Sequence, residues 1–387
     1  MTAGVLAGCG HTEPEVTTGI SAETTSGTTA PAESLETAGS TLGTVVMTRT
    51  EPSDAPETSA PVTLETTSET TAPPTEPQTT PLTALPMLGE IEDVNGVLTV
   101  GACAMEYYYA SYDGLRSYAG YVNTLKSYLP DVDIYAMFIP IAISMYCPQG
   151  ISPGSDQETV MNDWYEMMPG VVGVDTFSRL YEHKNEYLYF RTDTHWTQRG
   201  GYYAYTAFCD AAGIRANPIG AYEYASSTGY LGYMYVILKG TNVGYLMNAN
   251  PDTVEKFKPV SDLTATGYYN PSMTGGGYGV TVVDMDSGNY YAFTDGDQPL
   301  IHIKNNSVSN GKIAIVTKDS YGNTLVPFLA DCYEELYVID QRHFNTSDTY
   351  SLNIVSFAQT HGVTDIIIEA NSFNASAASS NFGRMLP

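Results

Sequence analysis

Two short stretches of the chain hold residues that together can carry out acyl transfer. Residues 191–196 contain an aspartate and a histidine two positions apart, Asp193 and His195, and residues 318–323 contain Ser320. A serine hydroxyl is a weak nucleophile until a base accepts its proton, and an imidazole held by a carboxylate is well suited to that task. We therefore predict Ser320 as the nucleophile, His195 as the general base and Asp193 as the carboxylate that orients His195.

Each half of this site also has a structural explanation. His195 beside Trp196 fits a buried structural histidine, and Asp319-Ser320 before a helix fits an N-cap. A metal site that uses Asp193 and His195 is a weaker alternative.

A serine at the start of a helix would lie beside free backbone N–H groups, which stabilise a developing oxyanion. We predict the N–H of Ser320 itself, with that of Gly322 or Asn323, as donors of this kind.

Alternating strand-like and helix-like patterns begin near residue 90 and would position both stretches. Strand patterns occupy 96–101, 133–140, 171–174, 187–190, 312–317, 336–339 and 365–369. Helical patterns occupy 115–129, 156–168, 198–212, 321–330 and 349–361. This alternation predicts an α/β fold with three layers, α/β/α, around a mostly parallel sheet. Reactive groups project from the carboxyl ends of such strands, so Ser320 and Asp193, each after a strand pattern, are predicted to share one edge.

The segment 214–300 interrupts this rhythm with glycines, tyrosines and short strand patterns, and we predict a β-rich insertion in a domain over 89–387. Within it, Asp284 and Asp286 hint at a calcium loop, but a hairpin turn is the stronger interpretation. The tyrosines at 107–109, 202–205 and 230–235 fit core or edge positions, or a surface on which a sugar stacks.

The N-terminal part has a different composition. Residues 10–85 contain no Trp, Tyr or Phe and hold eleven acidic residues against one base, Arg49. Such a segment buries too little apolar surface to offset its ordering entropy, so we predict a disordered Thr/Pro/Glu-rich stalk over 10–88. Residues 1–9 end in Leu-Ala-Gly-Cys9, a lipobox-like sequence after a truncated signal, which predicts lipidation of Cys9 and membrane attachment at the cell surface.

The charge and the cysteines narrow the possible partners. A net charge of −27 makes nucleic acid a poor partner and fits a neutral substrate better than an anionic one. The other cysteines show no Cys-x-x-Cys spacing, which leaves zinc unsupported and favours buried free thiols, although one disulfide is chemically allowed outside the cell. These are Cys103, Cys147, Cys209 and Cys332.

Several ordered motifs resemble the DHHW protein family of bacterial surface proteins. In chain order they are YFRTDTHWT at 189–197, GGYYAY at 200–205, KDSYGN at 318–323, VPFLA at 326–330 and VIDQR at 338–342. The family is related to the SGNH hydrolase-like O-acetyltransferases of alginate modification, and the resemblance covers about residues 90–387.

The resemblance implies an SGNH-type fold in which Asp193, His195 and Ser320 match the catalytic residues. It also implies an acetyl group as the transferred unit, a polysaccharide as its carrier, and no cofactor. The family name refers to Asp-His-His-Trp, and Thr194 stands in place of the first histidine. Arg342 follows a strand pattern on the same edge and is a candidate to hold a carboxylate or to stabilise an oxyanion, with a structural ion pair as the alternative. Gly296 is a further candidate oxyanion or substrate-binding residue, and Asp297 stands where an oxyanion-type asparagine is expected.

The predicted function is therefore a surface-anchored serine esterase or O-acetyltransferase that acts on acetyl esters of a polysaccharide. The alternative is a catalytically inactive module of the same fold that binds polysaccharide or mediates adhesion.

Overall fold

The structure, a computed structural model, describes residues 82, 89–377 and 381–387. The predicted lipobox (1–9) and almost all of the predicted stalk (10–88) lie outside these residues.

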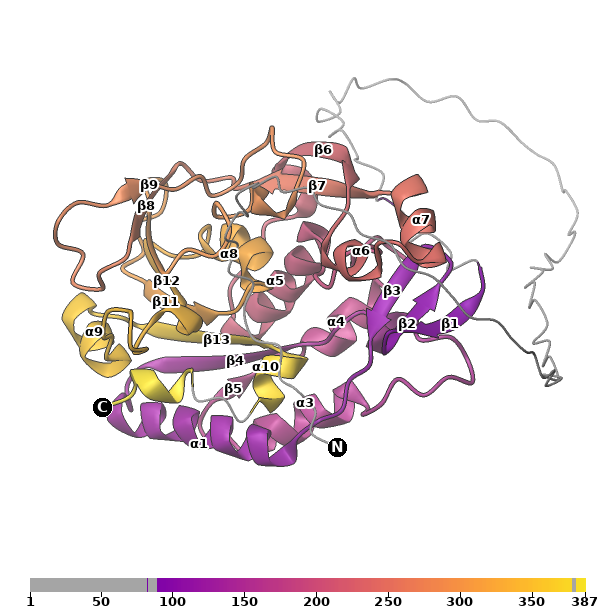
Figure 1. The fold of residues 1–387 in the computed structure, drawn as a ribbon. Coiled ribbons are helices and arrows are strands. Elements are labelled where there is room, and N and C mark those ends of the chain that lie inside the picture. Colours follow the sequence, from indigo (N-terminus) through magenta and orange to yellow (C-terminus); the bar gives the residue numbers. More distant parts are fainter. Residues whose placement is uncertain (1–81, 83–88, 378–380) are drawn as a thin grey trace, which may run out of the picture. The chain divides into compact units, whose positions relative to one another are not determined.

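A sheet of eight strands forms the centre of the described domain (Figure 1). Its order is β5-β4-β13-β11-β12-β10-β8-β9, parallel from β5 to β12 and antiparallel from β12 to β9. The strands are β4 (Asp133–Ile139), β5 (Val172–Gly173), β8 (Leu263–Tyr268), β9 (Tyr278–Gly279), β10 (Leu300–Asn305), β11 (Ile313–Lys318), β12 (Glu335–Asp340) and β13 (Asp365–Asn371). The predicted mostly parallel sheet is confirmed.

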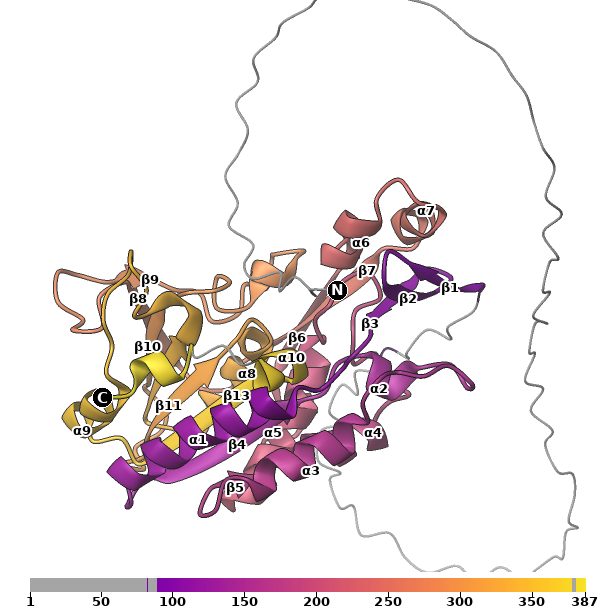
Figure 2. The same ribbon diagram turned by 60° about the horizontal axis from the view of Figure 1, so that its bottom comes forward.

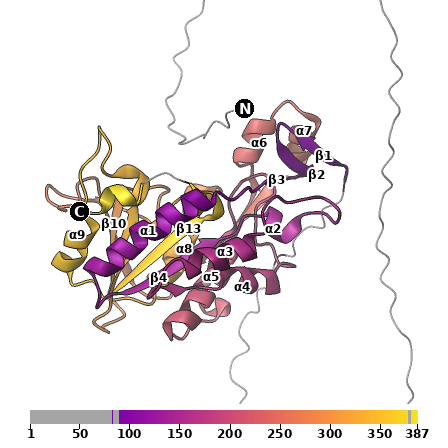
Figure 3. The same cartoon turned by 90° about the horizontal axis from the view of Figure 1, so that it is seen from below.

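The parallel strands are apolar along nearly their whole length because both of their faces are covered. Figures 1 and 2 show α1 (Tyr112–Tyr128) on one side of β4 and β13, with α5 (Gln198–Ala212) and α8 (Gly322–Leu329) on the other. The view from below in Figure 3 shows the same arrangement of α1 over β4 and β13. The result is a mixed α/β fold with helices on both faces of the sheet.

The start and end signals of the helices lie where the sequence places them. The α5 helix begins after Thr197, whose side chain accepts a hydrogen bond from the Gly200 N–H, and ends at Gly213 in the left-handed conformation (φ 66°). Ser111 caps α1 in the same way. The other helices are α2 (Ile143–Tyr146), α3 (Gln157–Glu166), α4 (Thr176–Glu182), α6 (Tyr233–Leu238), α7 (Asn242–Ala249), α9 (Ile354–His361) and α10 (Ser372–Ser376).

Two of the predicted strands are placed differently. The pattern at 96–101 forms β2 (Val97–Val100), but this strand lies in a separate antiparallel sheet between β1 (Ile91–Val94) and β3 (Cys103–Glu106). Among the residues that the structure describes, the pattern at 187–190 forms no strand, and its bridge there is the antiparallel one from Tyr189 to Trp196. The prediction that Asp193 and His195 follow a strand of the sheet was therefore wrong. They lie in a tight hairpin-like loop that leads into α5.

The predicted insertion (214–300) is less uniform than a β-rich appendage. It contains a two-stranded sheet of β6 (Glu223–Tyr230) and β7 (Asp252–Lys258), with α6 and α7 between the two strands. Its last strands, β8, β9 and β10, extend the central sheet instead of standing apart from it. The insertion is thus part of the wall around the candidate site.

Candidate active site

Three predicted residues form a continuous hydrogen-bonded chain. His195 Nε2 lies 2.8 Å from Ser320 Oγ, and His195 Nδ1 lies 2.5 Å from Asp193 Oδ1. Asp193 is buried, and the His195 side chain is 15% exposed. The order of contacts, from carboxylate to imidazole to hydroxyl, is the one that activates a serine.

Asp193 is held by more than its histidine. Its Oδ1 accepts a hydrogen bond from the His195 N–H (2.9 Å), and its Oδ2 accepts one from the Tyr230 hydroxyl (2.6 Å) and one from the Tyr233 N–H (2.9 Å). Gly232 allows this approach, since a Cβ there would lie 1.9 Å from Oδ2. Burial alone would raise the pKa of Asp193, but His195 and these donors outweigh it and hold the pKa below its ordinary value. The carboxylate is therefore charged and fixed.

Two aromatic rings lie against the imidazole. The Tyr290 ring stacks on His195 at 4.2 Å between centroids and an angle of 18°, and Tyr321 lies at 5.0 Å and 51°. Tyr321 also ties the two halves of the site together, because its hydroxyl donates to the Thr194 carbonyl and its own carbonyl accepts from Trp196 Nε1 at 2.9 Å. The imidazole has little room to rotate.

Ser320 lies in the turn between β11 and α8, at the carboxyl end of β11. It does not cap the helix, because α8 has Tyr321 at its N-cap position and no side-chain cap hydrogen bond. Asp319 shapes this turn by accepting the Tyr321 N–H (2.8 Å) and the Asn371 N–H (2.9 Å). The Ser320 hydroxyl is therefore directed to His195 and not to the helix.

The loop that carries Asp193 is fastened by a buried carboxylate that the sequence did not reveal. Asp252 is fully buried on β7 and accepts hydrogen bonds from the Arg191 N–H and Nε, from the Thr192 N–H and hydroxyl, and from the Tyr187 hydroxyl.

Thr194, in the same loop, makes a separate contact. Its hydroxyl donates to Glu106 on β3, so the position at which the family name has a histidine is used here for a loop contact.

Arg342 belongs to a charge network beside the turn that carries Ser320. Its Nη2 lies 2.5 Å from Asp340 Oδ2 and 2.8 Å from Asp297 Oδ2, and the buried Lys318 ammonium lies 3.2 Å from the same Asp340 oxygen. Burial raises the pKa of Asp340, but Lys318 and Arg342 outweigh it and lower the pKa below its ordinary value. Asp297 accepts from Asn323 Nδ2 (2.9 Å) as well, so it is a charge partner in this network and not a hydrogen-bond donor.

Most of the backbone groups predicted as oxyanion donors are engaged elsewhere. The N–H groups of Gly322 and Asn323 donate to the carbonyls of Asp319 (3.2 Å) and Ser320 (3.3 Å), and the Gly296 N–H donates to Phe293 (2.9 Å). Their oxyanion role stays a prediction. The Ser320 N–H, by contrast, has no hydrogen-bond partner among the residues that the structure describes.

A buried glutamate lies behind the turn that carries Ser320. Glu369 is fully buried; its Oε2 accepts the Asp319 N–H at 3.0 Å, and its Oε1 has no partner in the described part of the chain. Burial, together with the charge of Asp319, raises the pKa of Glu369 well above its ordinary value.

Replacing Glu369 by glutamine should therefore change how stability depends on pH. With a raised native pKa, the stabilising contribution of wild-type Glu369 is complete below the unfolded-state pKa (about 4.3) and is lost as the pH rises through the native pKa. We expect Glu369→Gln to gain free energy of unfolding relative to wild type between pH 5 and pH 8, measured by urea denaturation. A constant difference across these pH values would contradict the assignment.

The predicted calcium hint has a structural explanation. Asp284 Oδ1 accepts the Asp286 N–H at 3.0 Å in a turn, and the Lys256 ammonium lies 2.7 Å from the Met285 carbonyl oxygen. Within residues 89–377 and 381–387, no group of three or more His, Cys, Asp or Glu residues is placed to hold a metal ion.

The four cysteines within the described residues are free thiols. They are buried except for Cys147, which is half-buried. No helix in the described ranges combines the length and apolar character that crossing a bilayer requires.

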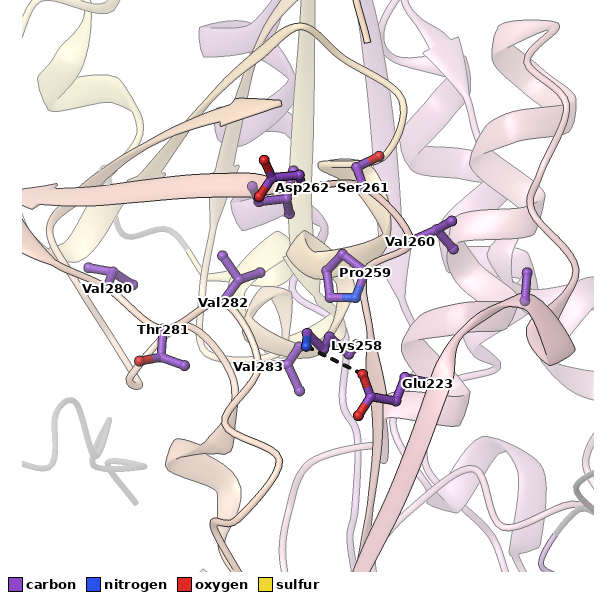
Figure 4. A pocket seen from close by; sticks show the side chains of 12 residues that line it. Glu223, Lys258, Pro259, Val260, Ser261, Asp262, Val280, Thr281, Val282 and Val283 are labelled. Carbon is purple, nitrogen blue, oxygen red and sulfur yellow. Dashed lines mark hydrogen bonds and ion pairs between the residues drawn. The ribbon is translucent and has the colours of Figure 1, made fainter. Parts of the chain in front are cut away.

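A groove of about 700 Å³ lies outside the triad, between the β6–β7 pair and residues 280–283 (Figure 4). Its lining includes the ion pair of Lys258 with Glu223 (3.3 Å) and the neighbouring Ser261 and Asp262. None of the residues that line it belongs to the Asp193–His195–Ser320 chain.

Fold and site together define a mixed α/β protein with an aspartate, a histidine and a serine hydrogen-bonded in series beside the carboxyl edge of a mostly parallel sheet. The sequence profile described as "DHHW protein" matches residues 66–339. The chain belongs to the DHHW family, as its motifs predicted.

The chain is also similar to several solved structures. A DHHW family protein from Eubacterium siraeum DSM 15702 is 28% identical, with a TM-score of 0.67, over 79% of this chain and 100% of that one. PatB1 of Bacillus cereus, solved with a sulfonyl adduct, is 17% identical with a TM-score of 0.59 over 75% and 98% of the two chains. The O-acetyltransferase domain of Pseudomonas putida AlgJ is more distant, at 14% identity and a TM-score of 0.42 over 77% and 94%. No curated protein matches the chain.

Proposed function

We propose that the protein is an SGNH-type serine esterase or O-acetyltransferase that acts on acetyl esters of a polysaccharide outside the cell. The observation that carries the proposal is the series of contacts from Asp193 Oδ1 through the His195 imidazole to Ser320 Oγ, at 2.5 and 2.8 Å. A structural histidine needs neither a fixed carboxylate on one nitrogen nor a serine hydroxyl on the other.

The reaction uses these residues in two half-reactions. Ser320 Oγ attacks the acetyl carbonyl carbon while His195 Nε2 accepts the hydroxyl proton. The Ser320 N–H, which has no partner among the described residues, is available as a donor to the developing oxyanion. His195 then gives the proton to the departing sugar oxygen, which leaves acetyl-Ser320. Asp193, held ionised, stabilises the imidazolium between these steps.

The second half-reaction decides between esterase and transferase. His195 deprotonates either water or a sugar hydroxyl, and that oxygen attacks the carbonyl carbon of acetyl-Ser320. The bond from this carbon to Ser320 Oγ breaks, His195 returns the proton to Oγ, and acetate or a newly acetylated sugar is released. PatB1, which shares the fold, forms a sulfonyl adduct. Because sulfonyl reagents modify activated hydroxyl nucleophiles, that adduct supports a nucleophile of the kind proposed here.

The net charge of the chain bears on which acetylated polysaccharide it uses, and the lipobox-like sequence at residues 1–9 bears on where the protein is located. A chain with net charge −27 repels anionic substrates, so a neutral acetylated glycan fits better than a polyuronate. Attachment through a lipidated Cys9, with residues 10–88 as a spacer, would place the domain at the outer face of the membrane.

The test is a comparison of acetyl acceptors. The purified chain is incubated with a chromogenic acetyl ester, with and without neutral oligosaccharides, and both acetate and acetylated sugar are quantified. Consumption of the ester supports the proposal, and the ratio of the two products assigns hydrolysis or transfer. An absence of ester consumption, together with binding of the oligosaccharides, would instead establish the non-catalytic binding module.

A further inference from the structure

A buried ammonium occupies the turn that resembles a calcium loop. Lys256, on β7, is fully buried, and its Nζ donates to the carbonyls of Met285 (2.7 Å) and Ser287 (2.6 Å) and to the Ser227 hydroxyl (2.8 Å). An ammonium has three N–H donors, and all three are used.

The positive charge of Lys256 is balanced by two nearby carboxylates, Asp284 and Asp286. Burial lowers the pKa of Lys256, while the charges of Asp284 and Asp286 act in the opposite direction. An isolated buried ammonium is costly, so three acceptors and two nearby carboxylates are what such a group requires. We call the turn over residues 284–289 the lysine-filled turn. The Lys256 ammonium binds its carbonyl groups, at a place where the sequence hinted at a calcium ion.

This turn leads directly to a ring on the catalytic histidine. Asn289 Oδ1 accepts the Tyr291 N–H at 2.8 Å, and Tyr290 between them is directed inward. The Tyr290 ring stacks on His195 at 4.2 Å, and its hydroxyl donates to the Ser320 carbonyl at 2.8 Å. Tyr290 thus contacts both the base and the nucleophile residue.

Backbone pairing between residues 283–284 and 292–293 holds the two ends of the turn together. The Asp284 N–H donates to the Ala292 carbonyl at 2.8 Å, and Val283 bridges Phe293, which is fully buried. The two ends of the turn are therefore paired with each other, and the Lys256 ammonium holds the carbonyls between them. Without that ammonium, the carbonyl oxygens of Met285 and Ser287 would lose their hydrogen-bond donor, and the charges of the nearby carboxylates would no longer be balanced by Lys256.

We propose that Lys256 is a positioning residue: by filling this turn it sets Tyr290 against His195 and keeps His195 Nε2 aimed at Ser320. The proposal rests on the proposed function, because positioning matters only if His195 acts as the base. The electron-rich face of Tyr290 also favours the imidazolium that forms during the reaction.

The first test uses a spectroscopic readout that needs no turnover. A stacked tyrosine shifts the His195 ring protons upfield, and they are assigned by comparison with His195→Gln. We expect Lys256→Met and Tyr290→Leu both to remove this shift and Tyr290→Phe to retain it. Lys258→Met is the matched control, because Lys258 lies two residues further along β7, is 54% exposed and has a surface ion pair with Glu223. An unchanged His195 spectrum in folded Lys256→Met would overturn the proposal.

The second test is kinetic. Misplacing the imidazole should lower kcat of Lys256→Met about 10- to 100-fold while KM changes little, and Lys258→Met should match the wild type. Lys256→Ala should recover activity with propylammonium, which replaces the missing methylenes and ammonium, but not with propanol. Equal recovery with both compounds would show that volume and not charge is needed, and would overturn the proposal. If the wild type itself turns over no acetyl ester, the proposed function fails, while the spectra still decide whether Lys256 positions Tyr290.

Discussion

Ser320→Ala should reduce the turnover of a small acetyl ester by roughly four to six orders of magnitude, since removing the nucleophile of a serine triad leaves only residual catalysis. The hydroxyl that is lost lies 2.8 Å from His195 Nε2 and makes no helix cap, so the fold should be unaffected. Steady-state hydrolysis rates and the thermal unfolding midpoint, measured on the same preparation, check both statements.

Ser261→Ala provides the matched control for that experiment. Ser261 lines the separate groove of Figure 4 and contributes no side chain to the triad. Its variant should keep wild-type turnover. Loss of activity in Ser261→Ala with retention in Ser320→Ala would move the reaction from the triad to the groove.

Asp252→Ala should have the largest effect on stability. Its carboxylate is fully buried and accepts from the Arg191 and Thr192 backbone, from their side chains and from Tyr187. Truncation therefore leaves the Nε of the half-buried Arg191 and several other donors without their acceptor. Removing one partner of a buried charge pair costs about 3–5 kcal/mol. We expect a loss of this size in the free energy of unfolding by denaturant titration.

The same substitution should impair catalysis, because the loop fastened by Asp252 carries Asp193 and His195. Asp262→Ala is the control: Asp262 is exposed, and its loss should change stability by no more than about 0.5 kcal/mol. A cost in Asp252→Ala as small as in this control would show that the loop is held by other contacts.

The framework of the fold was predictable because its signals are local. The apolar run of β11 and the left-handed glycine that ends α5 are both written within a few consecutive residues, and both predictions are confirmed. The predicted strand at 187–190 is wrong for a physical reason. Its aromatic residues are buried, but in the described residues they pack in a hairpin-like loop whose bridge is the one from Tyr189 to Trp196. Apolar residues signal burial more reliably than they signal strand pairing.

The three central site residues were identifiable because the chemistry restricts their types and the motifs fix their order. Their supports were not. Tyr230, Asp252 and Tyr290 reach the site from the insertion, and nothing in the local sequence distinguishes Tyr230 from a core tyrosine. Contacts between residues far apart in the chain depend on the folded geometry, so only the structure could assign them.

The candidate oxyanion donors were predictable only in part: the sequence located the region but did not single out the free N–H group. A helix start after Ser320 predicts free backbone N–H groups in this region, but the turn uses those of Gly322 and Asn323 for its own hydrogen bonds. Which N–H group remains free depends on the turn geometry and not on the residue types.

The most direct measurement of the account's central claim is the mass of the enzyme during turnover. Rapid acid quenching after mixing with a chromogenic acetyl ester, followed by proteolysis and mass spectrometry, should find one acetyl group on the peptide that contains Ser320, and none on that peptide in Ser320→Ala. Turnover without this adduct, or an acetyl group on another residue that persists in Ser320→Ala, would contradict the assignment of Ser320 as the nucleophile.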